Sequence, residues 1–242
     1  MRYGIFSDVH ANLEALKAVL CAYKKENIDI YLCIGDVVGY GADPNECVEL
    51  VKKTAMITVA GNHDWASVDL FPVDYFNPQA KQAILWTKDN LSEQSRYFLE
   101  SLKPVYKNKD LILVHGTLEN PAEFDYMLDG YTANVTFQLM DTHLCFVGHS
   151  HIAGIFIQDQ AKRIYYQEVN HLKLEDKSKY IINVGSVGQP RDGNPSSAYC
   201  IYDTDKKEIF IKRVDYDIQT AYTKILTAGL PKSLAERILV GG

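Results

Sequence analysis

Short apolar runs alternate with longer segments of helical spacing in the first part of the chain. The apolar runs predict strands at residues 2–7, 30–34 and 56–60. Between them, residues 11–26 place apolar side chains on one helical face, and Asp43-Pro44 is typical of a helix that starts there and runs to about residue 53. Strands that are joined by helices pair in parallel, so this part predicts a parallel sheet buried on both faces.

The regular pattern breaks at residues 65–78, where aromatic side chains lie between prolines without a clear period. Two helices are expected next, one from Asn77-Pro78 to about residue 89 and one from Leu91-Ser92 to about residue 102. The rest is richer in strands, predicted at 111–115, 144–148, 153–158, 164–167, 180–184, 198–203 and 208–214. A helix near 131–142 interrupts them, and Asp217 and Pro231 open two closing helices.

Composition narrows the class of protein. Of 242 residues, 47% are hydrophobic and 23% charged, which excludes general disorder and allows a sizeable core. With no linker or internal repeat, we expect one domain over residues 1–242, with segment 65–102 as a candidate aromatic cap. The net charge of −6 does not favour binding to duplex nucleic acid.

The location of the protein is predicted from what the sequence lacks. It has no run of about 18 apolar residues and no apolar signal-peptide region at its start. Its five cysteines are scattered, which is typical of buried free thiols. We therefore expect a cytoplasmic protein with no membrane partner, of an oligomeric state that the sequence does not indicate.

Polar side chains of metal-ligand type follow five of the predicted strands. Side chains at the carboxyl ends of strands in such a sheet converge on one crevice. Residues two apart in an extended segment point the same way, so Asp8 with His10, and His149 with His151, each present two ligands to one place. The full candidate set is Asp8, His10, Asp36, Asn62, His115, His149 and His151.

The chemistry of this set favours a catalytic metal centre. It offers oxygen and nitrogen donors and no thiolate, which suits Mn²⁺, Fe²⁺ or Zn²⁺ better than it suits a structural zinc site. Seven ligands suit two ions that share a bridging carboxylate. Two divalent ions would leave the site positive inside an acidic protein, which fits an anionic substrate such as a phosphate ester. Any one of these residues alone would more commonly be a helix cap or a core residue, but five such motifs together favour function.

The motifs Asp8–His10, Gly35–Asp36, Gly61–Asp64, His115–Gly116 and Gly148–His151, in this order, resemble those of the calcineurin-like metallophosphoesterase family. The resemblance implies an α/β fold, a four-layer αββα sandwich of two mixed β-sheets flanked by helices. It also implies two divalent metal ions, of the manganese, iron, zinc or nickel type.

The resemblance further assigns roles to the motif residues. One ion would take Asp8, His10, Asp36 and His151, and the other would take Asp36, Asn62, His115 and His149. Asp36 would bridge the two ions. His63, held in orientation by Asp64, would lie beside the leaving group and protonate it.

Gly39–Pro44, Trp86-Thr87 and Gly185–Arg191 are similar to a bacterial branch described as diadenosine tetraphosphatase-like or YfcE-like phosphodiesterases. The arginine that protein Ser/Thr phosphatases carry after the second motif is replaced here by Val38-Gly39-Tyr40, which argues against phosphoprotein substrates. Arg191 either clamps a phosphate or pairs with a surface carboxylate. Tyr40 either lines the site or packs.

The expected function is hydrolysis of phosphate esters or phosphoanhydrides by in-line attack of a metal-bound hydroxide. The expected substrate is a small phosphorylated molecule, a nucleotide or a dinucleoside polyphosphate, bound with help from Asn62, Arg191 and Tyr40. A broad-specificity phosphodiesterase or phosphatase is the alternative within the enzyme class. A non-catalytic protein-binding scaffold is the alternative outside it, although no ligand position is missing here.

Overall fold

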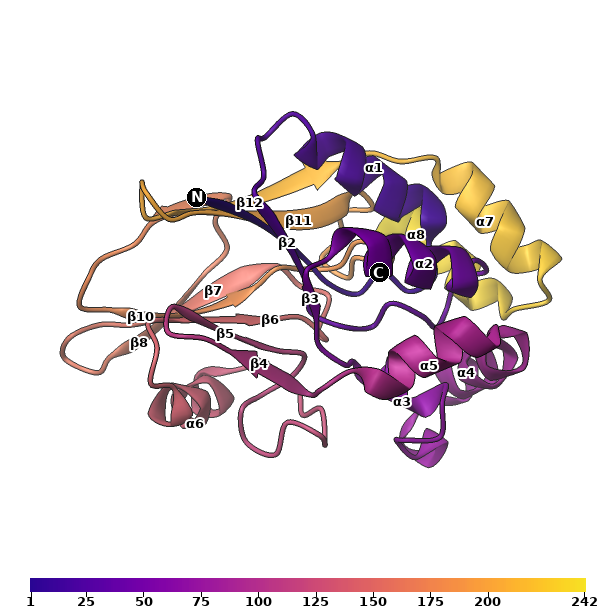
Figure 1. Cartoon of the computed structure of the whole chain (residues 1–242), viewed down its shortest axis with the longest axis horizontal. Helices are drawn as coiled ribbons and strands as arrows, with labels where there is room; N and C mark the ends of the chain where they lie inside the picture. The colour runs from indigo at the N-terminus through magenta and orange to yellow at the C-terminus, as the bar shows by residue number, and fades with distance from the viewer.

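The computed structural model describes residues 1–242 and consists of two mixed six-stranded sheets that face each other, with helices on the outer sides (Figure 1). The strand orders are β3-β2-β1-β11-β12-β9 and β4-β5-β6-β10-β7-β8. This confirms the four-layer αββα sandwich expected from the resemblance. None of the helices has the length and apolar character that a membrane crossing requires.

The first sheet begins with the parallel strands predicted from the N-terminal pattern. β1 pairs in parallel with β2, and β2 with β3, while β11, β12 and β9 continue the sheet in antiparallel pairs. The strands are β1 (Arg2–Phe6), β2 (Ile30–Cys33), β3 (Ile57–Thr58), β9 (His171–Lys173), β11 (Ser197–Asp203) and β12 (Glu208–Val214).

The second sheet has a parallel centre, β5-β6-β10, flanked by antiparallel strands. Its strands are β4 (Val105–Lys107), β5 (Leu111–Val114), β6 (Leu144–Val147), β7 (Gly154–Gln158), β8 (Ile164–Gln167) and β10 (Lys179–Asn183). The candidate ligands follow five of the parallel strands, β1, β2, β3, β5 and β6, so the chemistry lies at their carboxyl ends.

Most of the helices start where the sequence predicts. Asn77 and Ser92 cap α4 and α5 by accepting hydrogen bonds from Ala80 N and Ser95 N. The helical segments are α1 (Leu13–Tyr23), α2 (Pro44–Thr54), α3 (Asn62–Ala66), η1 (Val73–Tyr75), α4 (Pro78–Asn90), α5 (Glu93–Ser101), α6 (Gly130–Leu139), α7 (Ile218–Thr227) and α8 (Lys232–Val240).

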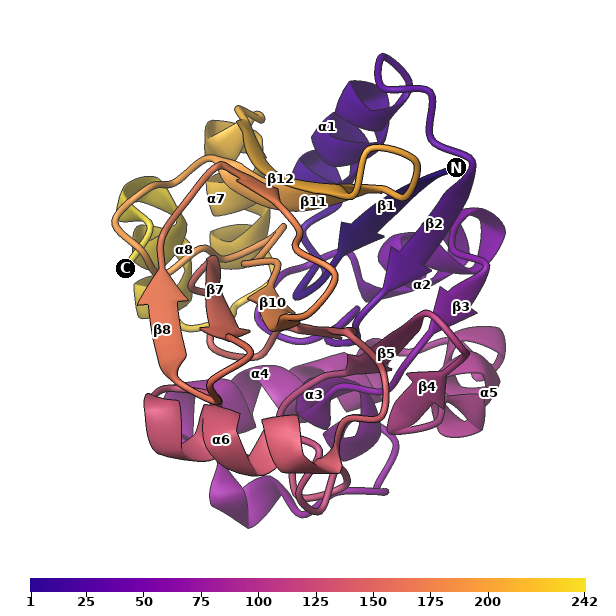
Figure 2. The same ribbon diagram turned by 90° about the vertical axis from the view of Figure 1, so that its left-hand side faces the viewer.

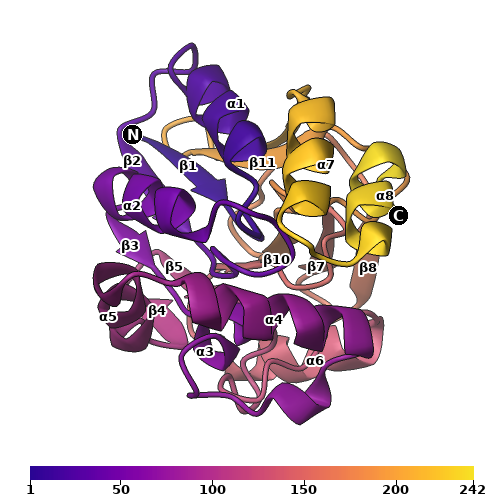
Figure 3. The same cartoon turned by 90° about the vertical axis from the view of Figure 1, so that its right-hand side faces the viewer.

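Three apolar layers hold the sandwich together. Ile5 and Leu32 of the first sheet pack against Leu113 and Phe146 of the second. On the outer face of the first sheet, α1 and α2 cover a second cluster, and α1 lies beside α7 (Figure 3). On the outer face of the second sheet, α6 packs through residues such as Phe137 (Figure 2).

Several local predictions are corrected by the tertiary structure. β3 is only two residues long, because the chain turns into the short helix α3 at Asn62. The edge strands β4 and β9 were not predicted, since three-residue segments carry too little pattern. Asp43 precedes α2 but makes no cap hydrogen bond, and its carboxylate pairs with Lys224 instead. Four cysteines are buried, as expected, while Cys21 is exposed.

Candidate metal centre and substrate pocket

The candidate ligands lie together where the carboxyl ends of strands from both sheets meet. Those that follow β1, β2 and β3 face those that follow β5 and β6. All seven are buried: Asp8, His10, Asp36, Asn62, His115, His149 and His151. Ligands far apart in the sequence are therefore brought to one place by the packing of the two sheets.

Most of these residues have left-handed backbone conformations. Positive φ angles occur at Asp8 (55°), His10 (50°), Asp36 (49°), His149 (67°) and His151 (62°). The left-handed conformation costs a non-glycine residue about 1–2 kcal/mol. Such a concentration of strained residues is typical of functional sites, where the rest of the fold holds side chains in place.

Two motif glycines are required by the close approach of the carboxylates. A Cβ atom at Gly61 would collide with the side chain of Asp36, and one at Gly148 would collide with Ser7 and Asp8. The glycines next to the ligands therefore leave room for the ligands from neighbouring strands.

A first group of ligands consists of Asp8, His10, Asp36 and His151, whose ligand atoms all lie within 4.8 Å of one another. The Nε2 atoms of His10 and His151 are 3.0 Å apart, and His151 Nε2 is 3.2 Å from Asp8 Oδ1. His10 Nε2 is 3.6 Å from Asp36 Oδ2. The group matches the first ligand set that the resemblance implies.

A second group consists of Asp36, His115 and His149, again within 4.8 Å. His115 Nε2 lies 3.2 Å from Asp36 Oδ2. The side-chain oxygen of Asn62 is buried in the same pocket and has no hydrogen-bond partner. Asp36 is the residue that the two groups share.

The hydrogen bonds of the imidazoles fit a metal. Nδ1 of His10 lies 3.1 Å from Val38 O, that of His115 2.6 Å from Ile34 O, and that of His151 2.6 Å from Gln189 O. A carbonyl oxygen only accepts, so each Nδ1 donates, which leaves Nε2 of each ring as the atom that can bind a metal in the centre. Lone pairs and carboxylates that converge without donors between them call for a cation.

The pKa shifts indicate the same need for positive charge. Burial lowers the pKa of His10 and His149 well below the usual value, which keeps these rings neutral. Burial also acts to lower the pKa of His115, but the carboxylates of Asp36 and Asp8 outweigh it and raise this pKa to about 9. The carboxylate pair thus attracts positive charge, and a divalent cation meets that demand.

His63 lies beside the ligands without belonging to either group. Its ring is 4.4 Å from that of Tyr40, 4.8 Å from that of His10 and 5.0 Å from that of Phe76. Its Nδ1 is buried without a partner, and burial lowers its pKa to about 4. The ring is oriented by packing and faces the pocket.

The expected contact between Asp64 and the His63 ring is absent, so that part of the prediction is wrong. The carboxylate of Asp64 accepts hydrogen bonds from the backbone N–H groups of Val37, Val38 and Gly61, at 2.8, 3.2 and 3.0 Å. Asp64 therefore ties the loop after β2 to the turn after β3. Burial, together with the charge of Asp36, raises its pKa to about 7.

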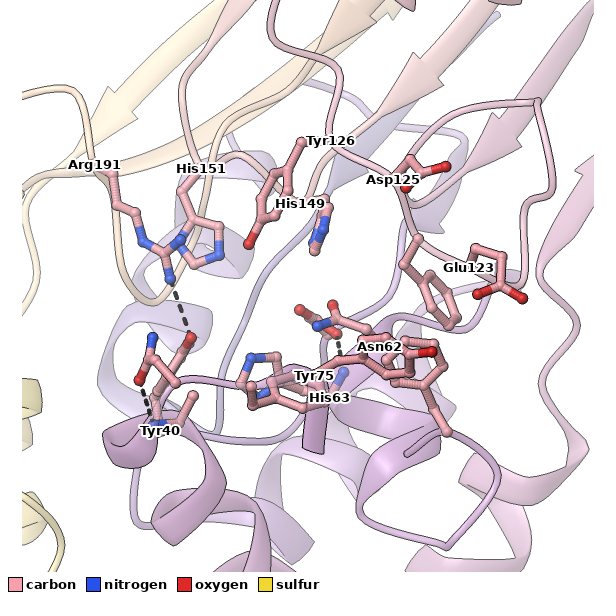
Figure 4. A pocket seen from close by; sticks show the side chains of 16 residues that line it. Tyr40, Asn62, His63, Tyr75, Glu123, Asp125, Tyr126, His149, His151 and Arg191 are labelled. Atoms are coloured by element: carbon pink, nitrogen blue, oxygen red, sulfur yellow. Dashed lines mark hydrogen bonds between the residues drawn. The ribbon is translucent and has the colours of Figure 1, made fainter. Parts of the chain in front are cut away.

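Arg191 and Tyr40 both line the pocket. Arg191 Nη2 donates to Gln189 Oε1 at 3.0 Å and to the hydroxyl of Tyr40 at 3.3 Å, as Figure 4 shows for Tyr40. Both hydrogen bonds of the Arg191 side chain go to neutral groups, no carboxylate lies within ion-pair distance of it, and its Nε is buried without a hydrogen bond. The alternative of a surface ion pair is therefore wrong for Arg191.

The pocket above the ligands has a volume of about 450 Å³. Phe71, Tyr75 and Phe76, from the segment that broke the sequence pattern, form part of its wall. Phe71 also packs on Phe124, with ring centroids 5.2 Å apart, so the segment serves both the pocket and the core.

Sequence reasoning missed the loop that follows the His115-Gly116 motif. Glu123, Phe124, Asp125 and Tyr126 of this loop line the pocket, and the ring of Tyr126 stacks on that of His149 at 3.8 Å. The proximity of this loop to a ligand motif was the only signal in the sequence. Its irregular path gives no periodic pattern to read.

Comparison with known proteins identifies the family. Residues 1–207 match the family described as "Calcineurin-like phosphoesterase superfamily domain". The uncharacterized protein MJ0912 of Methanocaldococcus jannaschii is 42% identical over 242 residues, which are 98% of this chain and 97% of the relative. The crystal structure of a metallophosphoesterase from Sphaerobacter thermophilus is 40% identical and covers 100% of this chain and 99% of its own, with a TM-score of 0.88.

A more distant structure, of a putative diadenosine tetraphosphatase, is 16% identical with a TM-score of 0.55 and covers 88% of this chain and 94% of its own. At that identity it shares the fold alone. The family match and the two full-length relatives carry the conclusion: the chain belongs to the calcineurin-like phosphoesterase superfamily and is a metal-dependent phosphoester hydrolase.

Proposed function

We propose that this hydrolase works with two metal ions and cleaves small phosphate esters. The observation that carries the proposal is the sharing of Asp36 between two groups of buried ligands. A single ion in the first group would leave His115 and His149 without a metal partner in the interior, and a single ion in the second would leave Asp8, His10 and His151, which is costly.

The ligand assignment follows the two groups. Asp8, His10, Asp36 and His151 would hold one ion, and Asp36, Asn62, His115 and His149 would hold the other. When bound, two such ions polarise a phosphoryl group and lower the pKa of water, which supplies the nucleophile for in-line attack.

The remaining polar residues of the pocket would handle the substrate. Arg191, with the hydroxyl of Tyr40 beside it, would hold the non-bridging oxygens of the phosphoryl group. The Asn62 side chain also lines the pocket and would contact the phosphoryl group. His63 would donate a proton to the leaving oxygen, because its ring lines the pocket and belongs to neither ligand group. Burial keeps this ring neutral, so the proton would come from the N–H that a neutral imidazole carries.

Nucleoside esters are the substrate class that the aromatic wall supports. Tyr75 is 75% exposed and Phe71 lies next to it, with ring centroids 5.6 Å apart. Aromatic side chains of this kind stack flat groups such as nucleobases. We therefore propose a nucleotide as the natural substrate, bound with its phosphate at the ligands and its base at this wall.

Metal counting tests the shared ligand. Asp36→Asn should lose both ions, whereas His10→Ala should weaken mainly one, because Asp36 belongs to both groups and His10 to one. Purified wild type and both variants, loaded with Mn²⁺, are analysed for metal content and for cleavage of a panel of phosphoesters. Equal losses of a single ion in both variants would refute the shared ligand. Loaded wild type that cleaves no ester in the panel would refute the proposed substrate class.

A further inference from the structure

The pocket is electrically asymmetric. Glu123 and Asp125 line one side of it and are exposed, and neither carboxylate has a cationic partner or a hydrogen bond to its side chain. Figure 4 shows them on the opposite side of the pocket from Arg191. No lysine lines the pocket, and Arg191 is its only arginine.

The Arg191 side is built to hold an anion. Its guanidinium lies next to the hydroxyls of Tyr40 and Tyr126, and its charge acts to lower the pKa of both, although burial raises them overall. Only Nη2 of the guanidinium makes hydrogen bonds, to Tyr40 and Gln189, so Nη1 remains as a donor for a ligand. A single guanidinium and two hydroxyls provide enough hydrogen-bond donors for the oxygens of one phosphoryl group.

The opposite side of the pocket suits a flat chemical group that carries no negative charge. The ring of Phe71 contacts those of Phe76 and Phe124 edge to face, with centroids 5.9 and 5.2 Å apart. The two carboxylates border these rings. Aromatic faces combined with carboxylates attract cations and groups rich in N–H donors, and repel further phosphates.

His63 lies between the two sides, with its ring against Tyr40 on one flank and Phe76 on the other. Its Nδ1 is buried against Gly39, and the ring lines the pocket. A leaving group that extends from the ligands toward the aromatic wall passes this ring.

We propose that the pocket selects esters that carry a single phosphate and a flat leaving group that is neutral or cationic, and that Glu123 and Asp125 discriminate against polyphosphates. This inference rests on the proposed function, because it orients the substrate by the phosphate at the ligands. A dinucleoside polyphosphate chain would need several cations along its path, and the pocket offers Arg191 alone beyond the ligand groups.

Charged aryl phosphates test the discrimination. We would measure kcat/KM for phenyl phosphates with a para trimethylammonium or a para carboxylate group, in wild type and in the double variant Glu123→Gln/Asp125→Asn. Comparing variant with wild type on each substrate cancels the intrinsic reactivity of the two phenols. Each exposed carboxylate acts through water over several ångströms, so the ammonium-to-carboxylate preference should fall about tenfold in the double variant and less at high salt.

The double variant Asp89→Asn/Glu100→Gln is the matched control. It makes the same change in net charge at exposed carboxylates of α4 and α5 that do not line the pocket, and it should leave the preference unchanged. A preference for the carboxylate ester in wild type, or an equal fall in the control, would overturn the proposal. So would a kcat/KM for diadenosine tetraphosphate above that of the ammonium ester.

Binding separates this inference from the proposed function. The corresponding non-cleavable phenylphosphonates are titrated by calorimetry, and the ammonium compound should bind more tightly than the carboxylate compound, with the difference lost in Glu123→Gln/Asp125→Asn. If metal-loaded protein cleaves neither ester, the proposed function fails, while the phosphonate affinities still decide the charge preference. Equal affinities in wild type would refute the inference even if both esters are cleaved.

Discussion

The role of His63 gives the sharpest test of the chemistry. The substitution His63→Gln removes the ring but keeps a polar side chain of similar length. His63 belongs to neither ligand group, so both ions should remain bound. If His63 protonates the leaving group, the rate for an alkyl ester should fall by about 10²–10⁴, the usual contribution of a positioned general acid.

The structural cost of the same change is smaller and can be separated. The ring makes three close aromatic contacts, with His10, Tyr40 and Phe76. At about 0.5–1.5 kcal/mol for an aromatic pair, their loss lowers the free energy of unfolding by roughly 2–4 kcal/mol. For a chain of this size, that is a fall in Tm of about 4–16 °C, which leaves the fold intact at 25 °C.

The assay compares an alkyl ester with an aryl ester of an acidic phenol, which needs little help from a proton donor. The alkyl rate should fall much more than the aryl rate. His171→Gln, at an exposed histidine stacked on Phe210 away from the pocket, is the control and should change neither rate. Loss of metal would make His63 a ligand, and an equal slowing of both esters would limit it to an electrostatic role; either result would refute the proton donor.

Three further changes test the residues that surround the ligands. Gly148→Ala places a Cβ against Ser7 and Asp8 and should reduce the metal content of the protein. Gly130→Ala, with nothing within 4 Å of the new atom, should leave the metal content unchanged, and equal metal contents in the two variants would contradict a steric clash at Gly148. Asp64→Ala removes the acceptor for three buried backbone N–H groups. In urea unfolding of the metal-free protein, it should lower the free energy of unfolding by about 3–5 kcal/mol. A change below about 1 kcal/mol would contradict the role of Asp64 in joining the two loops. Tyr75→Ala should raise KM about 3- to 30-fold for a dinucleoside monophosphate and little for a small aryl diester, with Tm unchanged because Tyr75 is 75% exposed. Phe71→Ala should also lower Tm, because Phe71 packs on Phe124. A uniform loss on both substrates for Tyr75→Ala would assign Tyr75 to packing.

The sequence by itself determined the layers of the fold and the candidate ligands. Short apolar runs in the sequence predict the strands that carry the ligands, and the polar motif after each of these strands is visible in the sequence alone. Strand ends converge by a general rule of such sheets, so the grouping of Asp8 with Asp36 could be expected from local pattern alone. The helix starts at Asn77 and Ser92 could also be predicted from the sequence, because each cap is a contact between residues three apart in the chain.

Only the tertiary structure decided what the neighbouring polar residues do. Asp64 follows His63 directly, yet its carboxylate reaches the backbone of Val37 across two loops, because a side chain on the short helix α3 turns inward to unpaired N–H groups. Asp43 binds Lys224, which is 181 residues away. The asymmetry of the pocket arises from a loop without periodicity that carries Glu123 and Asp125, set opposite Arg191 by the packing of the two sheets. Spacing in the sequence fixes neighbours along a strand or helix, whereas contacts between loops depend on the path of the whole chain.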